Sequence, residues 1–233
     1  MTTTNLDQAF YPALRQLAHD VGVPPSWFLL IFYLESTLNP ASHTPNTRYY
    51  GLNQMDRDEL ARRNVVPEEY LTWPASVQMN GVITPWYVST VRSYGRGKVP
   101  ASPGVLYAYN LAPGNVYTRG QTEDTVLYAK AGPTAFETSA YNQNAGLDVD
   151  HSNTITIRDL DTILLRKARE APFRIALAEL GVEESLSPSS RIASAGRSDS
   201  QNGMLNPVAP KALAVVGLVG LAAAWWMGQE ERR

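Results

Sequence analysis

A single acidic side chain, Glu35, follows an unusually apolar stretch of the chain, the eight residues 27–34 (WFLLIFYL). A carboxylate at the edge of a buried segment is costly, and both desolvation and the negative end of a helix dipole raise the pKa of such a group. A carboxylic acid that stays neutral near pH 7 can protonate the oxygen of a glycosidic bond. The alternative, which the position alone favours, is a glutamate at a helix end that reaches solvent.

A second group of residues that could do chemistry lies in the segment DVDHSNTITIRD, residues 148–159. Its spacing is close to that of an EF-hand loop, and the segment resembles the shorter calcium loops of dockerin-type modules. The candidate calcium ligands are Asp148, Asp150, Ser152, Thr154, Thr156 and Asp159. Asn153 replaces the usual glycine but can adopt the same left-handed conformation. A metal-free, hydrogen-bonded turn of the same shape is the alternative.

Composition excludes several other classes of protein. The chain has 233 residues, no cysteine and a formal charge of −2, so thiolate metal sites, cysteine nucleophiles and a basic surface for nucleic acid are not expected. The three histidines, His19, His43 and His151, are far apart in the sequence, which argues against a histidine metal cluster or a serine-histidine triad.

The elements that must position Glu35 are mainly helices. Apolar residues at helical spacing predict a helix near residues 6–19, and Pro24-Pro25-Ser26 is a good start for the next one. That second helix is apolar on every face, so we expect it to be central and to carry Glu35 in about its last turn. Further helices are expected at residues 56–64, 75–94, 104–109 and 122–131, and on both sides of the aspartate-rich segment between residues 136 and 180. The predicted fold class is therefore mainly α.

Four blocks of sequence, in this order, resemble a known family. They are VPPSWFLLIFYLESTLNPAS, which contains Glu35, then YGLNQM, YAYNLAPGNV and TVLY at residues 50–55, 107–116 and 125–128. Together they are similar to the catalytic domain of soluble lytic transglycosylases and goose-type lysozymes, which cleave peptidoglycan. The resemblance covers about residues 5–135 and implies a lysozyme-like fold.

The resemblance assigns a role to individual residues. Glu35 matches the catalytic acid, and the matches to substrate-binding positions are Ser36, Gly51, Gln54, Tyr109, Asn110 and Tyr128. Gly51 would permit unusual backbone angles and the close approach of a sugar. Tyr109 is the aromatic residue expected to stack on a sugar, and Tyr128 would help to hold the glutamate.

Two departures from the family pattern are visible. Asn53 stands where the family prefers methionine, which is expected to make one wall of the cleft more polar. Leu111-Ala112 replace the usual Ala-Gly, which would narrow the approach to the backbone.

The family mechanism needs one carboxyl group and no metal cofactor. The glutamate protonates the bond between N-acetylmuramic acid and N-acetylglucosamine, then acts as a base while a 1,6-anhydro ring closes. The next carboxylates after Glu35 in the sequence, Asp56, Asp58 and Glu59, are expected to suit the start of a helix instead. Water attack would make the protein a hydrolytic lysozyme, and a domain without activity would make it a peptidoglycan-binding or structural virion protein.

The remainder of the chain divides by composition. Residues 1–135 are the predicted lysozyme-like domain, residues 136–180 a helical extension, and residues 181–210 a flexible linker rich in Ser, Pro, Gly and Asn. Residues 211–229 are predicted to form a transmembrane helix, since 17 consecutive residues in it carry no charge, and residues 230–233 form a charged tail. The alternative for the apolar segment is a hydrophobic tail buried in an assembly.

The expected location follows from these segments. The first residues, MTTTNLDQAFYPAL, show no signal peptide, yet a domain that cuts the cell wall must reach it. We therefore expect a phage virion protein, anchored in a membrane by its C-terminal helix and acting in the host periplasm or cell wall. Its partners would be peptidoglycan glycan strands, the membrane and other virion proteins. The alternative is a bacterial enzyme, anchored in the membrane and facing the periplasm.

Overall fold

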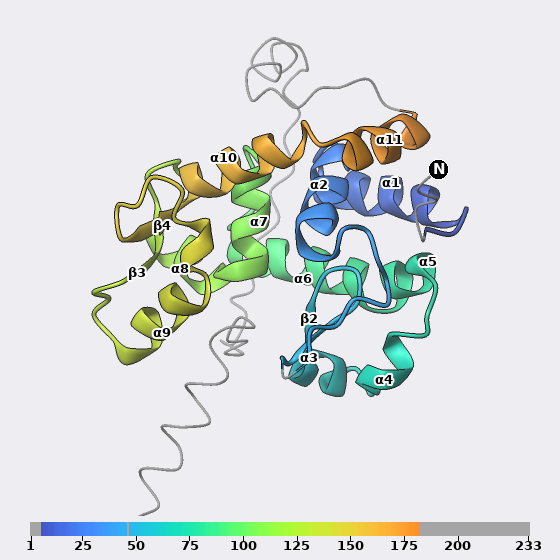
Figure 1. Cartoon of the computed structure of the whole chain (residues 1–233), viewed down its shortest axis with the longest axis horizontal. Coiled ribbons are helices and arrows are strands. Elements are labelled where there is room, and N and C mark those ends of the chain that lie inside the picture. The colour runs from blue at the N-terminus through green and yellow to red at the C-terminus, as the bar shows by residue number, and fades with distance from the viewer. Residues whose placement is uncertain (1–5, 46, 182–233) are drawn as a thin grey trace, which may run out of the picture.

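The computed structural model describes residues 6–45 and 47–181, which form a mainly helical fold (Figure 1). The predicted transmembrane helix, the charged tail and the linker beyond Gly181 lie outside the described residues. Within those two ranges no single helix is long and apolar enough to span a membrane. Only α1 (Phe10–Val21) and α2 (Pro25–Ser36) have that length and apolarity when they are taken together, and the two helices are bent by 115° relative to each other.

The first half of the described chain contains most of the helices that surround the core. After α1 and α2, its elements are β1 (Tyr49–Tyr50), β2 (Met55–Asp56), α3 (Arg57–Arg62), α4 (Pro67–Tyr70), α5 (Ala75–Gln78), the π-helix η1 (Met79–Ile83) and α6 (Thr84–Tyr94). The second half continues with α7 (Pro103–Leu111), α8 (Pro113–Arg119), β3 (Val126–Ala129), α9 (Ala135–Gln143), the short 3₁₀-helix η2 (Ala145–Leu147), β4 (Thr154–Thr156), α10 (Ile157–Lys167) and α11 (Ala171–Leu180).

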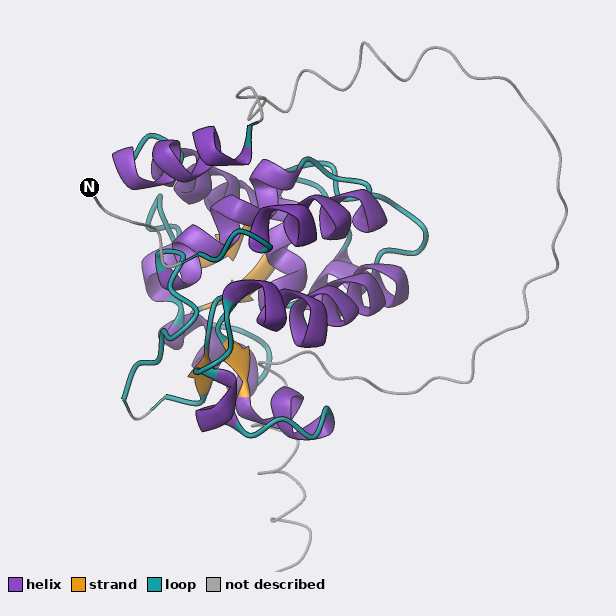
Figure 2. Cartoon of the chain, turned by 90° about the vertical axis from the view of Figure 1, so that its right-hand side faces the viewer, coloured by secondary structure: helices purple, strands orange, loops and turns teal. Residues whose placement is uncertain are grey.

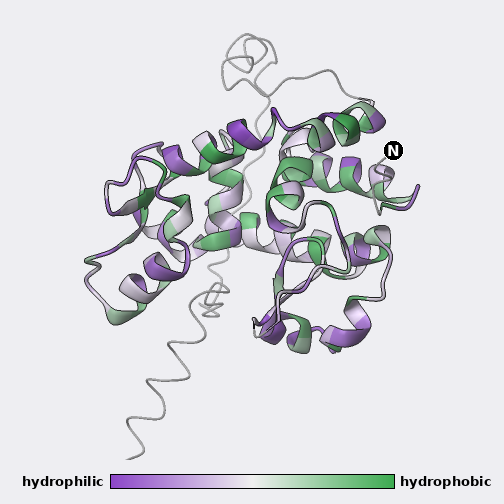
Figure 3. Ribbon diagram, in the orientation of Figure 1, coloured by the Kyte–Doolittle hydropathy of each residue, from purple (hydrophilic) through white to green (hydrophobic). Residues whose placement is uncertain are grey.

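Helix α2 is the centre of the fold, as its sequence predicts. Residues 26–33 are all buried, and α1, α7, α10 and α11 pack around the helix (Figure 3, in which α2 is largely hydrophobic). The helix ends because Thr37 and Leu38 both take positive φ angles, 53° and 61°. Residues 26–33 of α2 are enclosed, whereas Glu35 in its last turn is only partly buried. The polar side chain of Glu35 therefore lies at the edge of the core.

Helix α7 is held at both of its ends by residues from later in the chain. At its start, the carboxylate of Asp161 accepts hydrogen bonds from the Gly104 N–H at 2.6 Å and from the Ser102 hydroxyl at 2.7 Å. At its end, the Tyr128 hydroxyl donates to the carbonyl of Leu111 at 2.6 Å. Helix N–H groups and carbonyls without partners are costly when buried, so these contacts fix where α7 lies.

The prediction of a helix at residues 122–131 is wrong. Residues 126–129 form strand β3, which pairs antiparallel with β4 and places Tyr128 opposite Ile155 (Figure 2 shows the short strands among the helices). Valine, tyrosine, isoleucine and threonine in the two segments suit a pleated sheet. Because β4 lies inside the aspartate-rich segment, the sheet joins the predicted lysozyme-like domain to the predicted extension. One hydrophobic core accordingly runs from Phe10 to Leu180.

The other predicted helices are close to their observed positions, with one irregularity, while α4 and α8 were not predicted. Residues 75–94, predicted as a single helix, are helical throughout but contain the π-helical turn η1. Pro85 follows this turn and has no N–H to give to the carbonyl four residues earlier, which favours the wider hydrogen-bond pattern.

Gly51 opens the turn between β1 and β2 and has a φ of 75°. A Cβ atom there would overlap the ring of Tyr70 and lie 2.6 Å from Oε1 of Gln78. The unusual backbone angle predicted for Gly51 is therefore present, but the group that approaches it closely is the protein's own core. Gly51 does not line the pocket described below.

We expect Gly51→Ala to lower the free energy of unfolding by about 2–4 kcal/mol. The alanine would be strained at the positive φ angle, and its methyl group would also overlap Tyr70 and Gln78. Gly97→Ala is the matched control, since Gly97 also has a φ of 75° but no atom within 4 Å of the added Cβ. That variant should lose only about 1 kcal/mol. Urea denaturation of both variants measures the difference, and equal losses would contradict the packing role of Gly51.

Candidate active site

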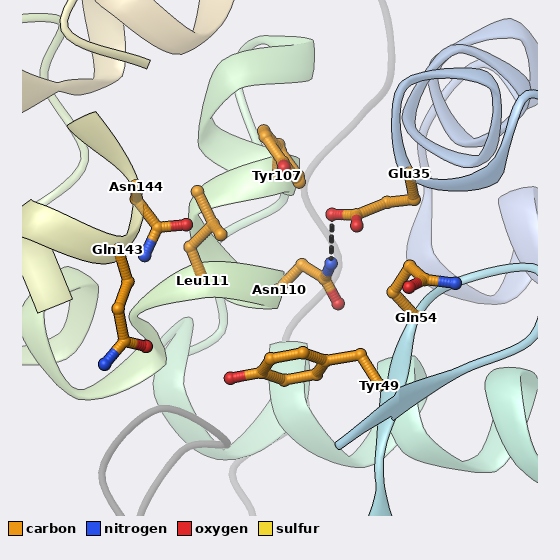
Figure 4. A pocket seen from close by; sticks show the side chains of 8 residues that line it. All are labelled: Glu35, Tyr49, Gln54, Tyr107, Asn110, Leu111, Gln143 and Asn144. Carbon is orange, nitrogen blue, oxygen red and sulfur yellow. Dashed lines mark hydrogen bonds between the residues drawn. The ribbon is translucent and has the colours of Figure 1, made fainter. Parts of the chain in front are cut away.

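An open pocket lies between the end of α2, the turn after β1 and helix α7, with the end of α9 opposite Glu35 (Figure 4). It encloses about 760 Å³ of empty space, including solvent at its mouth. Its lining residues are Glu35, Tyr49, Gln54, Tyr107, Asn110, Leu111, Gln143 and Asn144. Among the described residues that line it, Glu35 alone carries a carboxyl group.

The carboxyl group of Glu35 is largely desolvated. Burial raises its pKa to about 7, and hydrogen bonds from the side chains of Tyr107 and Asn110 oppose that rise only in part. The Asn110 amide nitrogen donates to Glu35 Oε1 at 3.0 Å. At neutral pH the group is therefore divided between its acid and its carboxylate form, the condition in which one side chain can both give and take a proton.

Helix α7 presents one face to the pocket. Tyr107, Asn110 and Leu111 are spaced i, i+3 and i+4, so they share a side of the helix. Tyr109 points away from it, is fully buried, and accepts a hydrogen bond from the Gln121 amide at 2.8 Å. The prediction that Tyr109 lines the cleft and stacks on a sugar is thus wrong, and Tyr107 is the aromatic residue of α7 that lines the pocket.

Two other predicted substrate-binding residues support the pocket from behind. The Ser36 hydroxyl donates to the Phe32 carbonyl within α2 at 3.0 Å and does not face the pocket. Tyr128 is buried and contacts the end of α7, so it holds that helix and makes no hydrogen bond to Glu35. Both predictions of substrate contact are corrected, because these side chains satisfy backbone carbonyls of the elements that carry the site.

Gln54 lies where the sequence predicts, on the pocket wall. Its φ is 46°, and its amide nitrogen donates to the carbonyls of Gly51 at 2.8 Å and Ser42 at 3.2 Å. These bonds close the turn that follows β1 and hold the side chain against it. Tyr49 from the same hairpin lines the pocket beside Gln54, where burial raises the pKa of its hydroxyl and the negative charges of Asp56 and Glu35 add to the rise.

Asn53 is not part of the cleft wall. It is fully buried, and its amide nitrogen donates to Oδ1 of Asn110 at 3.0 Å. The prediction of a more polar cleft wall is therefore wrong. Asn53 lies behind the wall and contacts Asn110, which lines the pocket. Leu111, the second departure, does line the pocket.

Gln143 and Asn144 at the end of α9 are pocket residues that the sequence did not reveal. Their amide nitrogens are held by the Ser139 hydroxyl at 3.1 Å and the Ala140 carbonyl at 2.9 Å. Figure 4 shows both side-chain carbonyl oxygens on the side that faces Glu35. They reach the site because α9 packs against β3, and the strand pairing behind that contact joins residues distant in the sequence.

The next three carboxylates after Glu35 in the sequence do not reach the pocket. Asp56 is buried, pairs with Arg48 at 2.5 Å and accepts from the Asp58 N–H at the start of α3. Asp58 pairs with the same arginine, and Glu59 pairs with Arg62 and Arg63. The prediction that they suit the start of a helix is confirmed, since Asp56 caps α3 and Asp58 and Glu59 lie in its first turn.

The aspartate-rich segment brings oxygen atoms of Asp148, Asp150 and Asp159 within 4.8 Å of one another. The same carboxylates accept hydrogen bonds within the loop: Asp148 from the N–H groups of Ser152 and Asn153, and Asp159 from Val149 and Thr156. Asn153 has the predicted left-handed conformation, with a φ of 65°. The donor set fits a calcium ion, while the hydrogen bonds alone also fix the turn, so calcium binding at this loop stays a prediction.

The pocket thus combines a desolvated carboxyl group, amide donors and acceptors, and two aromatic side chains, a combination suited to acid catalysis on a polar ligand. Comparison of the chain with family models, with curated proteins and with solved structures finds no match. The geometry of this site and the residues that form it are therefore the features that bear on function.

The raised pKa of Glu35 predicts a specific pH dependence of stability. Between about pH 4.5 and pH 7 the folded protein keeps a proton that the unfolded chain has lost, so its stability falls as the pH rises. We expect Glu35→Gln to remove that loss, which makes the variant more stable than the parent by up to about 3 kcal/mol above pH 7. At pH 4 the variant should show no such gain.

Urea denaturation of parent and variant at a series of pH values measures this difference directly. Because all other titrating groups are common to the two proteins, the difference isolates Glu35. A difference that does not change with pH would mean that Glu35 has an ordinary pKa.

Proposed function

We propose that this protein is a lytic transglycosylase with a lysozyme-like fold, which cleaves the β-1,4 bond between N-acetylmuramic acid and N-acetylglucosamine in peptidoglycan. The observation that carries the proposal is the position of Glu35: a carboxyl group at the end of a buried apolar helix, with its pKa raised to about 7, facing an open pocket. The order of the four sequence blocks that resemble the transglycosylases adds independent support.

In the first step Glu35 gives its proton to the glycosidic oxygen, and the N-acetyl group of the substrate assists departure of the leaving sugar. In the second step the Glu35 carboxylate takes the proton of the muramoyl C6 hydroxyl while that oxygen closes the 1,6-anhydro ring. The glutamate ends in the form in which it began. The reaction uses no metal and no second carboxylate.

The single-acid mechanism is favoured by the composition of the pocket. Classical glycosidases place two carboxyl groups about 5–9.5 Å apart across the scissile bond. Here the lining residues within the described part of the chain include one carboxyl group, and the next three carboxylates after Glu35 in the sequence are engaged by arginines. Hydrolytic cleavage by the same glutamate is the second candidate, since an open pocket admits water as an attacking group.

The cellular setting belongs to the same proposal. The uncharged residues 212–228 support attachment to a membrane, and we extend the proposal to a phage virion protein that meets the cell wall during genome entry. Glycan strands, the membrane and other virion proteins would be its partners. A bacterial protein anchored in the membrane and facing the periplasm is the alternative.

The test is digestion of purified peptidoglycan, with mass analysis of the soluble products. We expect muropeptides that end in 1,6-anhydro-N-acetylmuramic acid, and a loss of turnover of at least 100-fold in Glu35→Gln with binding to peptidoglycan retained. Products with reducing ends in place of the anhydro ring would identify a hydrolytic lysozyme. Binding without any product would identify a peptidoglycan-binding protein.

The rate should fall as the pH rises above about 7, because the first step needs the protonated form of Glu35 and its pKa is about 7. Well above that value we expect kcat/KM to drop tenfold for each pH unit. A profile that stays flat up to pH 9 would exclude Glu35 as the acid.

Gln143 and Asn144 are expected to contribute to substrate binding. With their nitrogens engaged inside α9, their carbonyl oxygens are left to accept hydrogen bonds from sugar hydroxyl or acetamido groups. Gln143→Ala and Asn144→Ala should each raise KM about 3- to 10-fold with little change in kcat. Gln16→Ala is the control, since Gln16 is an exposed amide whose partner, Asp20, lies on α1. An unchanged KM in both pocket variants would remove α9 from the binding site.

A further inference from the structure

A chain of hydrogen bonds reaches Glu35 from behind the pocket. The hydroxyl of Tyr87 donates to Oδ1 of Asn53 at 3.2 Å. The amide nitrogen of Asn53 then donates to Oδ1 of Asn110 at 3.0 Å. Finally, the amide nitrogen of Asn110 donates to Oε1 of Glu35 at 3.0 Å. Every link donates in the same direction, from the core toward the carboxyl group.

The two inner members of this chain are sealed from water. Tyr87 on α6 and Asn53 after β1 both have no exposed surface. The second N–H of the Asn53 amide points to the sulfur of Met55, with 3.4 Å between nitrogen and sulfur. A buried amide with unmet hydrogen-bonding groups would be destabilising, and here both its oxygen and its nitrogen have partners. The amide orientation of Asn53 is therefore defined by its surroundings.

The orientation of Asn110 depends on that of Asn53. Asn110 lines the pocket, and its side-chain amide has a donor NH₂ group on one side and an acceptor oxygen on the other. If the amide rotated by 180°, its oxygen would face Glu35 and repel the carboxylate form. The donor of Asn53 opposes this rotation, because it would then meet the NH₂ group of Asn110.

We propose that Asn53 is a positioning residue, which fixes the side chain of Asn110 with its donor toward Glu35 and thereby stabilises the carboxylate form of the catalytic acid. This inference rests on the function proposed above and extends it to a residue that touches no substrate. In the second step of the reaction Glu35 must exist as a carboxylate in a desolvated place, and a donor already fixed in position needs no rearrangement to stabilise it.

The burial of Glu35 and its hydrogen bonds act in opposite directions. Burial raises the pKa, and the hydrogen bonds from Tyr107 and Asn110 lower it toward neutrality. Losing the orientation of Asn110 should therefore leave an acid that holds its proton too strongly to act well as a base.

The test uses Asn53→Leu, which keeps the approximate shape of the side chain, and Tyr87→Phe, which keeps the ring packed against Phe28 and removes only the hydroxyl. The titration of Glu35 is followed in the full chain by NMR of ¹³C-labelled glutamate carboxyls, with Glu35→Gln used to assign the signal. We expect the pKa of Glu35 to rise by about one unit in Asn53→Leu and by less in Tyr87→Phe. The high-pH limb of kcat/KM on peptidoglycan should move upward by the same amounts.

Tyr33→Phe is the matched control. It also removes a tyrosine hydroxyl, one that donates to Glu170 at 2.6 Å and thereby joins α2 to the start of α11. It should lower stability and leave the titration of Glu35 unchanged. If lost stability alone changed the titration, the pKa of Glu35 would shift alike in all three variants, and this result would overturn the proposal.

A folded Asn53→Leu protein in which Glu35 titrates as in the parent would also overturn it. If that variant does not fold, a Tyr87→Phe protein with an unshifted Glu35 titration overturns the proposal in its place. The titration does not depend on activity. If the parent cleaves no peptidoglycan but the two variants shift the pKa as expected, the positioning role of Asn53 is supported and the proposed enzymatic function fails.

Discussion

The site depends on one constraint, the enclosure of a helix that is apolar on every face. Because α2 has no polar side, it is stable only with other helices around it, and α1, α7, α10 and α11 supply that cover. The enclosure leaves Glu35 at the margin of the core, where water is partly excluded. The property that makes Glu35 a candidate acid is therefore a consequence of how the core is built, and any change that loosens the cover of α2 should alter the pKa of Glu35 as well as the stability of the fold.

The second half of the described chain forms part of the site. Asp161 and Tyr128, on α10 and β3, hold the two ends of α7, the helix that brings Asn110 to Glu35. The end of α9 provides the wall opposite the acid. A chain that stopped at residue 135, where the family resemblance ends, would retain Glu35 but lack both the cap on α7 and that wall. The structural unit that carries the candidate site therefore extends beyond residue 135, into the helices that follow β4.

Patterns within short stretches of sequence correctly predicted the elements that are determined by those stretches alone. The all-apolar run, the proline start and the position of Glu35 in the last turn of α2 follow from hydrophobicity and helix geometry, and they are confirmed. Helical spacing could also have separated Tyr107 from Tyr109, because only Tyr107 shares a face with Asn110. Strand β3 and the pocket residue Gln143 could not be predicted in this way. Both depend on pairing or packing between segments far apart in the sequence, which leaves no periodic signal in either segment.

Asn53 illustrates a further limit, since its role depends on burial and on the direction of hydrogen bonds. In the sequence it is a polar residue in place of an apolar one, which suggests a more polar surface. In the fold the same amide is enclosed, and it accepts from Tyr87 and donates to Asn110 and Met55. An apolar residue at this position would leave Asn110 without a fixed orientation, so the energetic cost of burying an amide is offset by control over the donor that faces the acid. If Glu35 is the acid that we propose, Asn53 supports it by hydrogen bonding where the resembling family would use the packing of a methionine.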